Sequence, residues 1–352
     1  MQQESKPICV VIDTNTWISD SNLFLKTPLG AALLYILKRS NGYIGLPELI
    51  EDEVIKHTIR VGREAIQKIN SNFKKIEIIL GSRSTYELPN ENQLESVARE
   101  RFIELDHLII KIPFSFEQAK AAVKRINECS QPNGEKNQQF KDSVIWEAIL
   151  TLVNDYTVHF ITQDNAFYKN RRADSGYLAE NLLNDCQNLG SFVHIYQDIK
   201  SCLKQLQHSL PPLDYQSIIL AIDSVINPNL QRQVVAEIGF EIVSLASELS
   251  TISAFITEMI GKLALSFEIN YYLSDVHNTD DNERKNALLR VGGDCLYEFN
   301  SNSISDVKMD FERMTWLEPS GELGKRGIVY MSATLGGDNQ AKYMFREPLS
   351  NN

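Results

Sequence analysis

Four acidic residues lie at sequence positions from which their carboxylates could come close together in the folded chain. Asp13 and Asp164 each end an apolar run that reads as a β-strand, VVI and VHFIT respectively. Glu53 lies early in the helix predicted after residue 47, and Asp142 opens the helix predicted in KDSVIWEAILTLV. Strand ends and helix starts meet at the carboxyl edge of a parallel sheet, where ligands of open α/β folds bind. We therefore expect these four side chains to share a small volume.

Carboxylates held this close repel one another unless a hard cation neutralises them. Ligation by oxygen alone suits Mg²⁺ or Mn²⁺, which can activate a water molecule and stabilise charge on a phosphodiester. Three of the acids also have a structural alternative. Asp13 or Asn15 could cap the next helix, Asp142 could interact with its own helix start, and Glu53 could be a solvated helix residue.

The elements that position these acids alternate along the first 200 residues. This alternation predicts a mostly parallel sheet with helices on both faces, an α/β/α sandwich. The predicted strands cover 8–13, 43–46, 108–112, 157–162 and 191–196, and the predicted helices cover 28–40, 47–72, 90–106, 115–129, 141–154 and 176–188.

The pattern changes after the SLPP sequence at 209–212. A helix is predicted at 214–226, and apolar residues then alternate with mostly polar ones in LSFEINYYL, which is typical of a half-buried antiparallel strand. Further strands are predicted at 288–299, 304–317 and 326–332. We therefore predict two domains, residues 1–205 and a smaller, mainly antiparallel α+β domain at 206–352.

Composition and charge restrict the classes of partner. The net charge of −11 divides into −3 for residues 1–200 and −8 for residues 201–352, so a phosphate-bearing partner is expected only for the first part. No apolar run approaches the roughly 20 residues that span a membrane. The five cysteines lack the spacing of a zinc site and predict reduced thiols in a cytoplasmic protein.

The sequences around the four acids resemble those of the PIN-domain nucleases. They are VIDTN with Asp13, LPELIEDEV with Glu53, KDSVIWEA with Asp142, and FITQDNAF with Asp164. The resemblance covers about residues 1–200 and implies that all four acids bind the metal and catalyse cleavage. The substrate would be single-stranded or structured RNA, less often DNA, with a 5′-phosphate product. The long segment 58–140 departs from the family pattern.

The same resemblance implies that Thr14, Asn15 and Thr162 support the acids through hydrogen bonds. Basic residues follow two of the acids. Lys56, Arg60 and Arg63 share one face of the predicted helix after Glu53, and a second group follows Asp164. Either group could contact a phosphate backbone or be an ordinary solvated face. The second group consists of Lys169, Arg171 and Arg172.

Individual motifs also resemble those of other protein classes. DTNTW is similar to the D-x-D-x-T of some phosphatases, but Asn15 replaces their second acid. GIVYMSATLGG at 327–337 resembles a helicase motif, but the chain has no Walker A loop, so the likeness is interpreted as coincidence or as a relic of such a motif. RVGGD at 290–294 is interpreted as a turn or bulge.

The rival to a nuclease is a non-catalytic nucleic-acid or protein binding module. The carboxyl-terminal part would regulate, bind a partner or self-associate, and a toxin-like or phage-defence role rests on family analogy.

Overall fold

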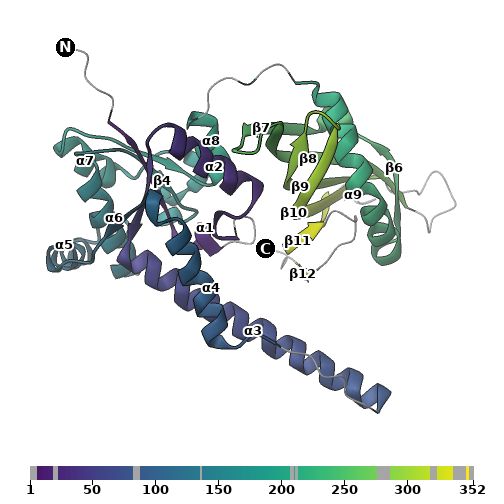
Figure 1. The fold of residues 1–352 in the computed structure, drawn as a ribbon, viewed down its shortest axis with the longest axis horizontal. Coiled ribbons are helices and arrows are strands. Elements are labelled where there is room, and N and C mark those ends of the chain that lie inside the picture. The colour runs from purple at the N-terminus through teal and green to yellow at the C-terminus, as the bar shows by residue number, and fades with distance from the viewer. Residues whose placement is uncertain are drawn as a thin grey trace. The chain divides into compact units, whose positions relative to one another are not determined.

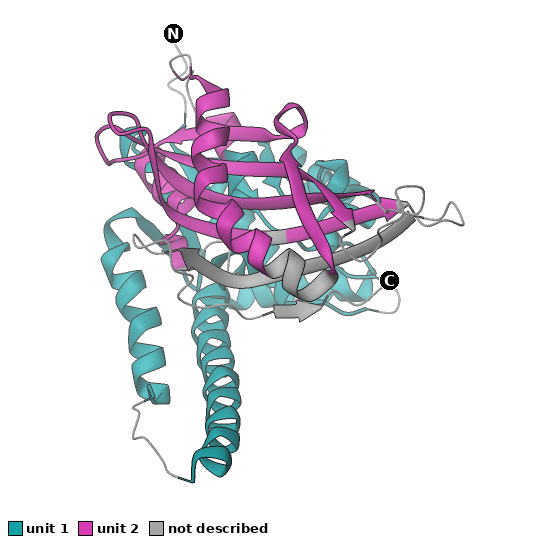
Figure 2. Ribbon diagram, turned by 90° about the vertical axis from the view of Figure 1, so that its right-hand side faces the viewer, with its two compact units in different colours: residues 1–19, 37–202 teal, residues 20–36, 203–352 magenta. Residues whose placement is uncertain are grey.

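The computed structural model describes residues 6–18, 23–81, 88–134, 137–206, 210, 213–275, 286–317, 323–335 and 346–348. The chain divides into two compact units, coloured separately in Figure 2. Unit 1 comprises residues 1–19 and 37–202, and unit 2 comprises residues 20–36 and 203–352. The predicted break at 206–212 lies mostly outside the described residues. The domain limits 1–205 and 206–352 therefore stay a prediction.

The sheet of unit 1 has five parallel strands in the order β3-β2-β1-β4-β5. Figure 1 shows the ribbon, with β4 labelled between the helices of this unit. The strands are β1 (Ile8–Ile12), β2 (Tyr43–Pro47), β3 (Ile109–Ile112), β4 (Thr157–Ile161) and β5 (Val193–Tyr196). In the centre, β1 pairs with β4, and Ile12 is in register with Ile161. The carboxyl ends of these two strands are therefore adjacent, which brings the segments after them together. This sheet confirms the predicted fold class of the amino-terminal part.

Helices flank this sheet. They are α1 (Thr14–Ile18), α3 (Glu48–Leu80), α4 (Glu91–Glu104), α5 (Phe116–Asn127), α6 (Phe140–Leu152) and α7 (Glu180–Asn188). Two more helices, α2 (Pro28–Arg39) and α8 (Ile199–Leu206), contribute residues to both units. Short 3₁₀ turns follow β4, among them η3 (Asn165–Phe167) and η4 (Lys169–Arg171). None of the described helices combines the length and apolar character needed to cross a bilayer.

Helix α3 is longer than the sequence predicted. The prediction ended it near residue 72, where Ser71 and Asn72 have low helix propensity, but it continues to Leu80. Gly81 ends it with a φ of 67°, and its backbone N–H donates to the Glu77 carbonyl at 2.8 Å. A left-handed residue after the last turn favours glycine because a side chain is strained there. The cap therefore lies at Gly81.

Helix α6 is fixed against its neighbours by packing and by an ion-pair network. Its residues Val144, Ile145, Ala148 and Ile149 are buried, as is the ring of Trp146. The indole donates a hydrogen bond of 3.0 Å to Asp185 of α7. The Arg125 guanidinium of α5 pairs with Glu147 of α6 at 2.5 Å and with the same Asp185 at 2.7 Å. These contacts hold α6 against α5 and α7.

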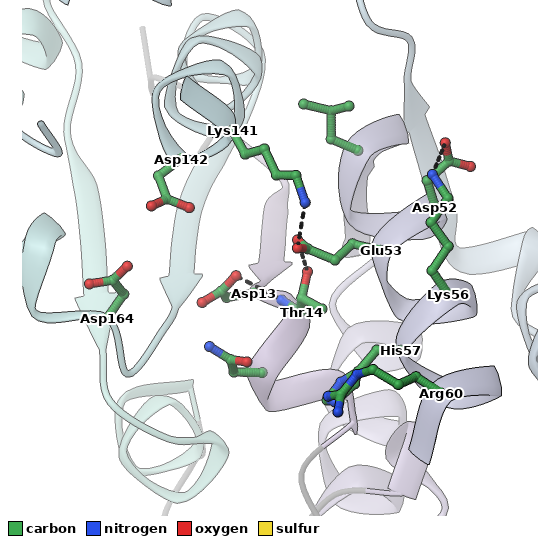
Figure 3. A pocket seen from close by; sticks show the side chains of 12 residues that line it. Asp13, Thr14, Asp52, Glu53, Lys56, His57, Arg60, Lys141, Asp142 and Asp164 are labelled. Carbon is green, nitrogen blue, oxygen red and sulfur yellow. Dashed lines mark hydrogen bonds and ion pairs between the residues drawn. The ribbon is translucent and has the colours of Figure 1, made fainter. Parts of the chain in front are cut away.

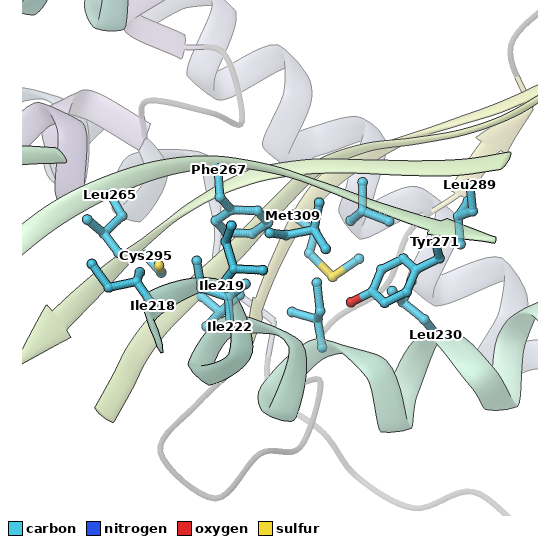
Figure 4. Packing of buried hydrophobic residues seen from close by; sticks show 14 of the residues in the cluster. Ile218, Ile219, Ile222, Leu230, Leu265, Phe267, Tyr271, Leu289, Cys295 and Met309 are labelled. Atoms are coloured by element: carbon cyan, nitrogen blue, oxygen red, sulfur yellow. The ribbon is translucent and has the colours of Figure 1, made fainter. Parts of the chain in front are cut away.

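Unit 2 is built from one long helix and a seven-stranded antiparallel sheet, as predicted for this part. The helix, α9 (Tyr215–Ile238), continues through Pro228 beyond its predicted end at 226. Ile218 and Ile222 of α9 pack with Phe267 and Tyr271 of β8 in one buried apolar cluster (Figure 4). The strands are β6 (Phe240–Leu245), β7 (Thr251–Ile256), β8 (Lys262–Asp275), β9 (Asn286–Glu298), β10 (Ser303–Leu317), β11 (Leu323–Leu335) and β12 (Arg346–Pro348).

The two carboxyl-terminal motifs are parts of this sheet. RVGGD lies inside β9 and does not form a turn, although the β10 register shifts beside it between Met309 and Phe311. A side chain at Gly293 would come within 2.0 Å of the Lys308 carbonyl oxygen, which explains a glycine there. The helicase-like stretch lies in β11 up to Leu335, paired with β10. The residues after Leu335 in that motif are outside the described ones.

Candidate active site

The four predicted acids line one cavity of about 450 Å³ in unit 1 (Figure 3). Asp13 follows β1, and its N–H donates to the Ile161 carbonyl of β4 at 2.9 Å. Asp164 follows β4 and precedes η3, whereas Glu53 comes from the second turn of α3. Asp142 is the third residue of α6. Two strand ends and two helix starts thus supply one carboxylate each, as predicted.

The capping alternatives are resolved by the hydrogen bonds. Asp13 accepts the Thr14 N–H at 2.7 Å, so it does interact with the start of α1. Asn15 lies inside α1 and lines the cavity, so it is not the cap. Asp142 is not a cap either, since the residue before α6 is Gln139 and no side chain caps that end. The carboxylate of Asp142 is therefore available to the cavity.

Thr162 connects the two strand-end acids. Its hydroxyl donates to Asp13 Oδ2 at 2.8 Å and accepts the Asp164 N–H at 3.0 Å. Thr162 is fully buried and Asp13 is 8% exposed, so this geometry is fixed by the protein interior. Asp164 Oδ1 in turn accepts the Ala166 N–H at 2.8 Å. Thr162 thus forms hydrogen bonds with both strand-end acids, and its supporting role in function stays a prediction.

Glu53 is held by two groups. The Thr14 hydroxyl donates to Glu53 Oε2 at 3.0 Å, and the Lys141 ammonium donates to Oε1 at 2.9 Å. Lys141 was not among the residues singled out from the sequence. Its position immediately before Asp142 on α6 is the signal that could have identified it. The ion pair places one positive charge among four carboxylates.

Burial and mutual repulsion raise the pKa of two of the acids. Loss of hydration raises the pKa of Asp13 to about 6, with the neighbouring carboxylates adding to the effect and the Thr162 hydroxyl opposing it. Loss of hydration also raises the pKa of Asp142 to about 7, followed by repulsion from Asp164, Asp13 and Glu53. Both shifts mean that ionisation of these carboxylates destabilises the folded protein. A bound cation would remove that cost.

The donor set fits a hard divalent cation by its chemistry. All four side chains offer oxygen atoms, the ligands that Mg²⁺ and Mn²⁺ prefer, and they face one cavity. Within the described part of the chain, no three His, Cys, Asp or Glu side chains are spaced closely enough to form a complete metal site. The four carboxylates therefore provide the type of ligand atom that such a cation needs. They would have to move closer together to coordinate the ion.

The comparison with known proteins agrees with this geometry. A family model described as the PIN domain matches residues 10–167, a range that contains all four acids. Residues 10–167 are a PIN domain. No curated protein and no solved structure matches the chain.

The two predicted basic groups lie in different places in the PIN domain. Lys56 and Arg60 line the cavity of the acids, and they also pair with Asp52 at 3.7 Å and Glu64 at 2.9 Å along the helix. Arg63 points instead to Glu91 of α4, at 2.7 Å. This pairing keeps Arg63 outside the residues that line the cavity.

The second basic group lies at another cavity, of about 460 Å³, lined by Lys169 and Arg171. Lys169 pairs with Glu180 at 3.2 Å, and the Arg171 guanidinium donates to the backbone carbonyl of Asn133. Arg172 forms an exposed ion pair with Asp174 at 2.6 Å. Of the predicted basic residues, Lys56 and Arg60 are the two that share a cavity with the acids.

Proposed function

We propose that the PIN domain is a divalent-metal-dependent endonuclease that cleaves RNA. The observation that carries the proposal is the convergence of Asp13, Glu53, Asp142 and Asp164 on one cavity, with the pKa of two of them raised. PIN domains are generally nucleases, which supports phosphodiester hydrolysis. The choice of RNA over DNA rests on the sequence resemblance to the PIN-domain nucleases.

We infer a distinct role for each residue of the site. Asp13, Asp142 and Asp164 would hold Mg²⁺ or Mn²⁺, which when bound lowers the pKa of a water ligand and neutralises charge on the scissile phosphate. Thr162 fixes the orientation of Asp13 and the backbone of Asp164. Glu53, whose Oε1 accepts a hydrogen bond from Lys141 at 2.9 Å, would complete the ligand set or orient water. Lys56 and Arg60, at the cavity wall, would contact the phosphate backbone.

The direct test uses the purified full chain and end-labelled RNA and DNA of matched sequence. Cleavage with Mn²⁺ or Mg²⁺, suppressed by EDTA and leaving 5′-phosphate ends, is the expected result. Cleavage of DNA alone would change the substrate class. Absence of cleavage with both ions, for both nucleic acids, would contradict the proposal.

A second candidate is a non-catalytic binding module, and the Lys141–Glu53 ion pair favours it because a permanent cation could replace the metal. Thermal melting separates the two candidates. A ligand that binds only the folded state stabilises it, by about 2.7 kcal/mol at 100 times its Kd. We therefore expect Mn²⁺ to raise the Tm relative to EDTA. An unchanged Tm at millimolar Mn²⁺ would favour the module.

Charge reversal at the cavity wall should weaken RNA binding. Lys56→Glu with Arg60→Glu removes two phosphate contacts, so affinity should fall for all sequences alike and the salt dependence should flatten by ~0.7 per contact for a single strand. Binding is measured in EDTA by fluorescence anisotropy at several salt concentrations. The matched control is Lys120→Glu with Lys124→Glu on α5, which makes the same change in charge away from the cavity. Equal losses in both variants would mean that only net charge matters.

We further propose that the protein acts in the cytoplasm and that unit 2 regulates the nuclease or binds a protein partner. All five cysteines are free and four are buried, as expected of a reducing compartment. Unit 2 contains no part of the four-acid cavity. Residues 201–352 also carry most of the net negative charge, which makes nucleic acid an unfavourable ligand there. A toxin-like or phage-defence role fits this arrangement by family analogy and is tested by expressing the wild type and an acid-cluster variant in growing cells.

A further inference from the structure

A second cavity of unit 1, of about 460 Å³, contains cationic side chains that do not line the four-acid cavity. Its lining includes Gln131, Asn133, Lys169, Asn170, Arg171 and Glu180. The first two of these residues belong to the segment that leads into α6, and the next three follow β4. Helix α6 carries Asp142, and the segment after β4 carries Asp164. The segments that supply two of the acids therefore also form the second cavity.

The Gln131 side chain connects the second cavity with Asp164. Its Nε2 donates to the carbonyl oxygens of Ala166 and Tyr168, at 3.1 and 3.2 Å. The N–H of the same Ala166 donates to Asp164 Oδ1 at 2.8 Å. A residue that lines the second cavity thus holds the backbone that orients the Asp164 carboxylate.

The Asn133 side chain makes the corresponding connection with Asp142. It is 1% exposed, donates to Ser143 Oγ at 2.7 Å and accepts the Gln139 N–H at 2.7 Å. Ser143 directly follows Asp142 in the first turn of α6. The two cavities are therefore neighbours, and they are joined at the residues beside Asp142 and Asp164.

The second cavity adjoins the side of the four-acid cavity that is farther from the cations of α3. In Figure 3, Asp142 and Asp164 lie on one side of the four-acid cavity, and Lys56 and Arg60 lie on the other. A nucleic-acid strand that crosses the acids from Lys56 and Arg60 therefore has the second cavity on its far side.

The Arg171 guanidinium is fixed at the second cavity by contacts of one nitrogen atom. Its Nη2 donates to the backbone carbonyls of Asn133 and, at 3.4 Å, of Pro132. The same Nη2 lies so close to Gly134 that a Cβ atom there would come within 2.8 Å of it. The hydrogen bonds of this guanidinium to the described residues all use Nη2, so Nε and Nη1 can donate to a ligand. A planar guanidinium held in place loses little freedom when it binds phosphate.

Lys169 supplies the second cation. Its ammonium group pairs with Glu180 at 3.2 Å, and the two side chains are 47% and 78% exposed. Ion pairs this exposed contribute little to stability. A phosphate bound by Lys169 and Arg171 can therefore replace Glu180 as the partner of Lys169.

We propose that the second cavity binds a backbone phosphate of the RNA strand that the four acids cleave, with Lys169 and Arg171 as its contacts. This inference rests on the proposed nuclease function and specifies how the substrate is held. Lys56 and Arg60 bind the strand on one side of the scissile bond, and Lys169 and Arg171 bind it on the other. The substrate must therefore continue past the scissile bond in both directions.

The first test measures the affinity of the full chain for a labelled single-stranded RNA in EDTA, by fluorescence anisotropy at several salt concentrations. Lys169→Gln is expected to weaken binding about 10-fold, as the loss of a hydrogen bond to a charged group does, and to flatten the salt dependence by ~0.7. Arg172→Gln is the matched control, because it removes the same charge from a residue that pairs with Asp174 and does not line the second cavity. Its affinity should stay near that of wild type. Both positions are exposed, so both variants should fold, as checked by circular dichroism.

Glu180→Gln tests the same site in the opposite direction. It removes the carboxylate that competes for Lys169, so RNA affinity should rise, whereas Asp174→Asn outside the second cavity should leave it unchanged. If Arg172→Gln weakens binding as much as Lys169→Gln does, binding depends on overall charge and the proposal fails. It also fails if Lys169→Gln binds RNA as tightly as wild type.

The second test uses an RNA whose cleavage site has been mapped, with one uncharged methylphosphonate linkage placed at successive positions. One position should raise KM for wild type but not for Lys169→Gln, in which that phosphate has already lost its partner. If no position behaves in this way, the second cavity is not a phosphate site. Cleavage together with unchanged RNA affinity in Lys169→Gln would contradict this site alone. Weaker affinity in that variant, with no cleavage by wild type, would contradict the nuclease alone.

Discussion

Asp142→Asn is expected to lower the rate of metal-dependent RNA cleavage by at least ~10³-fold, the scale on which electrostatic groups of an active site act. The side chain keeps its shape, so contacts in the first turn of α6 should survive. What is lost is a charged oxygen ligand facing the cavity. Single-turnover cleavage of labelled RNA with saturating Mn²⁺ measures the effect.

The same substitution should stabilise the protein when no metal is present. The folded-state pKa of Asp142, about 7, lies above its unfolded value, so ionisation disfavours folding. Wild type in EDTA should therefore lose stability as pH rises from about 4 to about 7, and the loss should persist above pH 7. Asp142→Asn removes this contribution, worth ~1–2 kcal/mol at pH 8 for a partly screened carboxylate. Denaturant unfolding in EDTA at several pH values measures it.

Asp155→Asn provides the control, since it makes the same chemical change at an exposed residue just after α6. Its cleavage rate and stability should match wild type. The variant at 142 should also lose most of the Mn²⁺-induced rise in Tm. Wild-type cleavage by Asp142→Asn would remove this residue from the site, whereas lost cleavage with lost folding would mean a structural role.

The strand and helix order of unit 1 could be predicted because each element carries a local signal. The β-branched run before Asp13 becomes the central strand β1, and the apolar stripe of α6 is buried as its spacing indicates. The convergence of the acids then follows from the parallel topology alone. The length of α3 could not be predicted in this way, because polar residues near Asn72 suggested an end, whereas the helix continues to its cap at Gly81.

The ion pair between Lys141 and Glu53 could not be predicted from the sequence for a different reason. Its partner Glu53 lies 88 residues away, and no local pattern relates the two. In unit 2, β6 and β7 were not predicted, because their apolar and polar residues do not alternate clearly. Their pairing with β8 depends on the folded sheet. Local periodicity thus predicts elements and the edge where a site forms, whereas individual side-chain partners depend on contacts between distant segments.

Thr162→Val is expected to weaken metal-dependent stabilisation and cleavage together, although Thr162 itself carries no charge. Valine has nearly the same shape, but it leaves Asp13 Oδ2 without its donor and the Asp164 N–H without its acceptor in a buried place. An unsatisfied buried polar group costs about 1–3 kcal/mol. Groups that orient metal ligands typically contribute 10–100-fold to affinity or activity, and we expect a loss in that range.

Two further variants separate orientation from general stability. Thr162→Ser keeps the hydroxyl and should restore most of the Mn²⁺-induced rise in Tm and the apparent Mn²⁺ affinity in cleavage. Thr157→Val, at the start of β4 and half-buried, removes a hydroxyl from the same strand far from its carboxyl end. If Thr162→Val lowers the Tm in EDTA but leaves the Mn²⁺ dependence of cleavage unchanged, Thr162 supports the fold alone. A shift in Mn²⁺ dependence that serine reverses would mean that this buried hydroxyl sets the geometry of both strand-end acids.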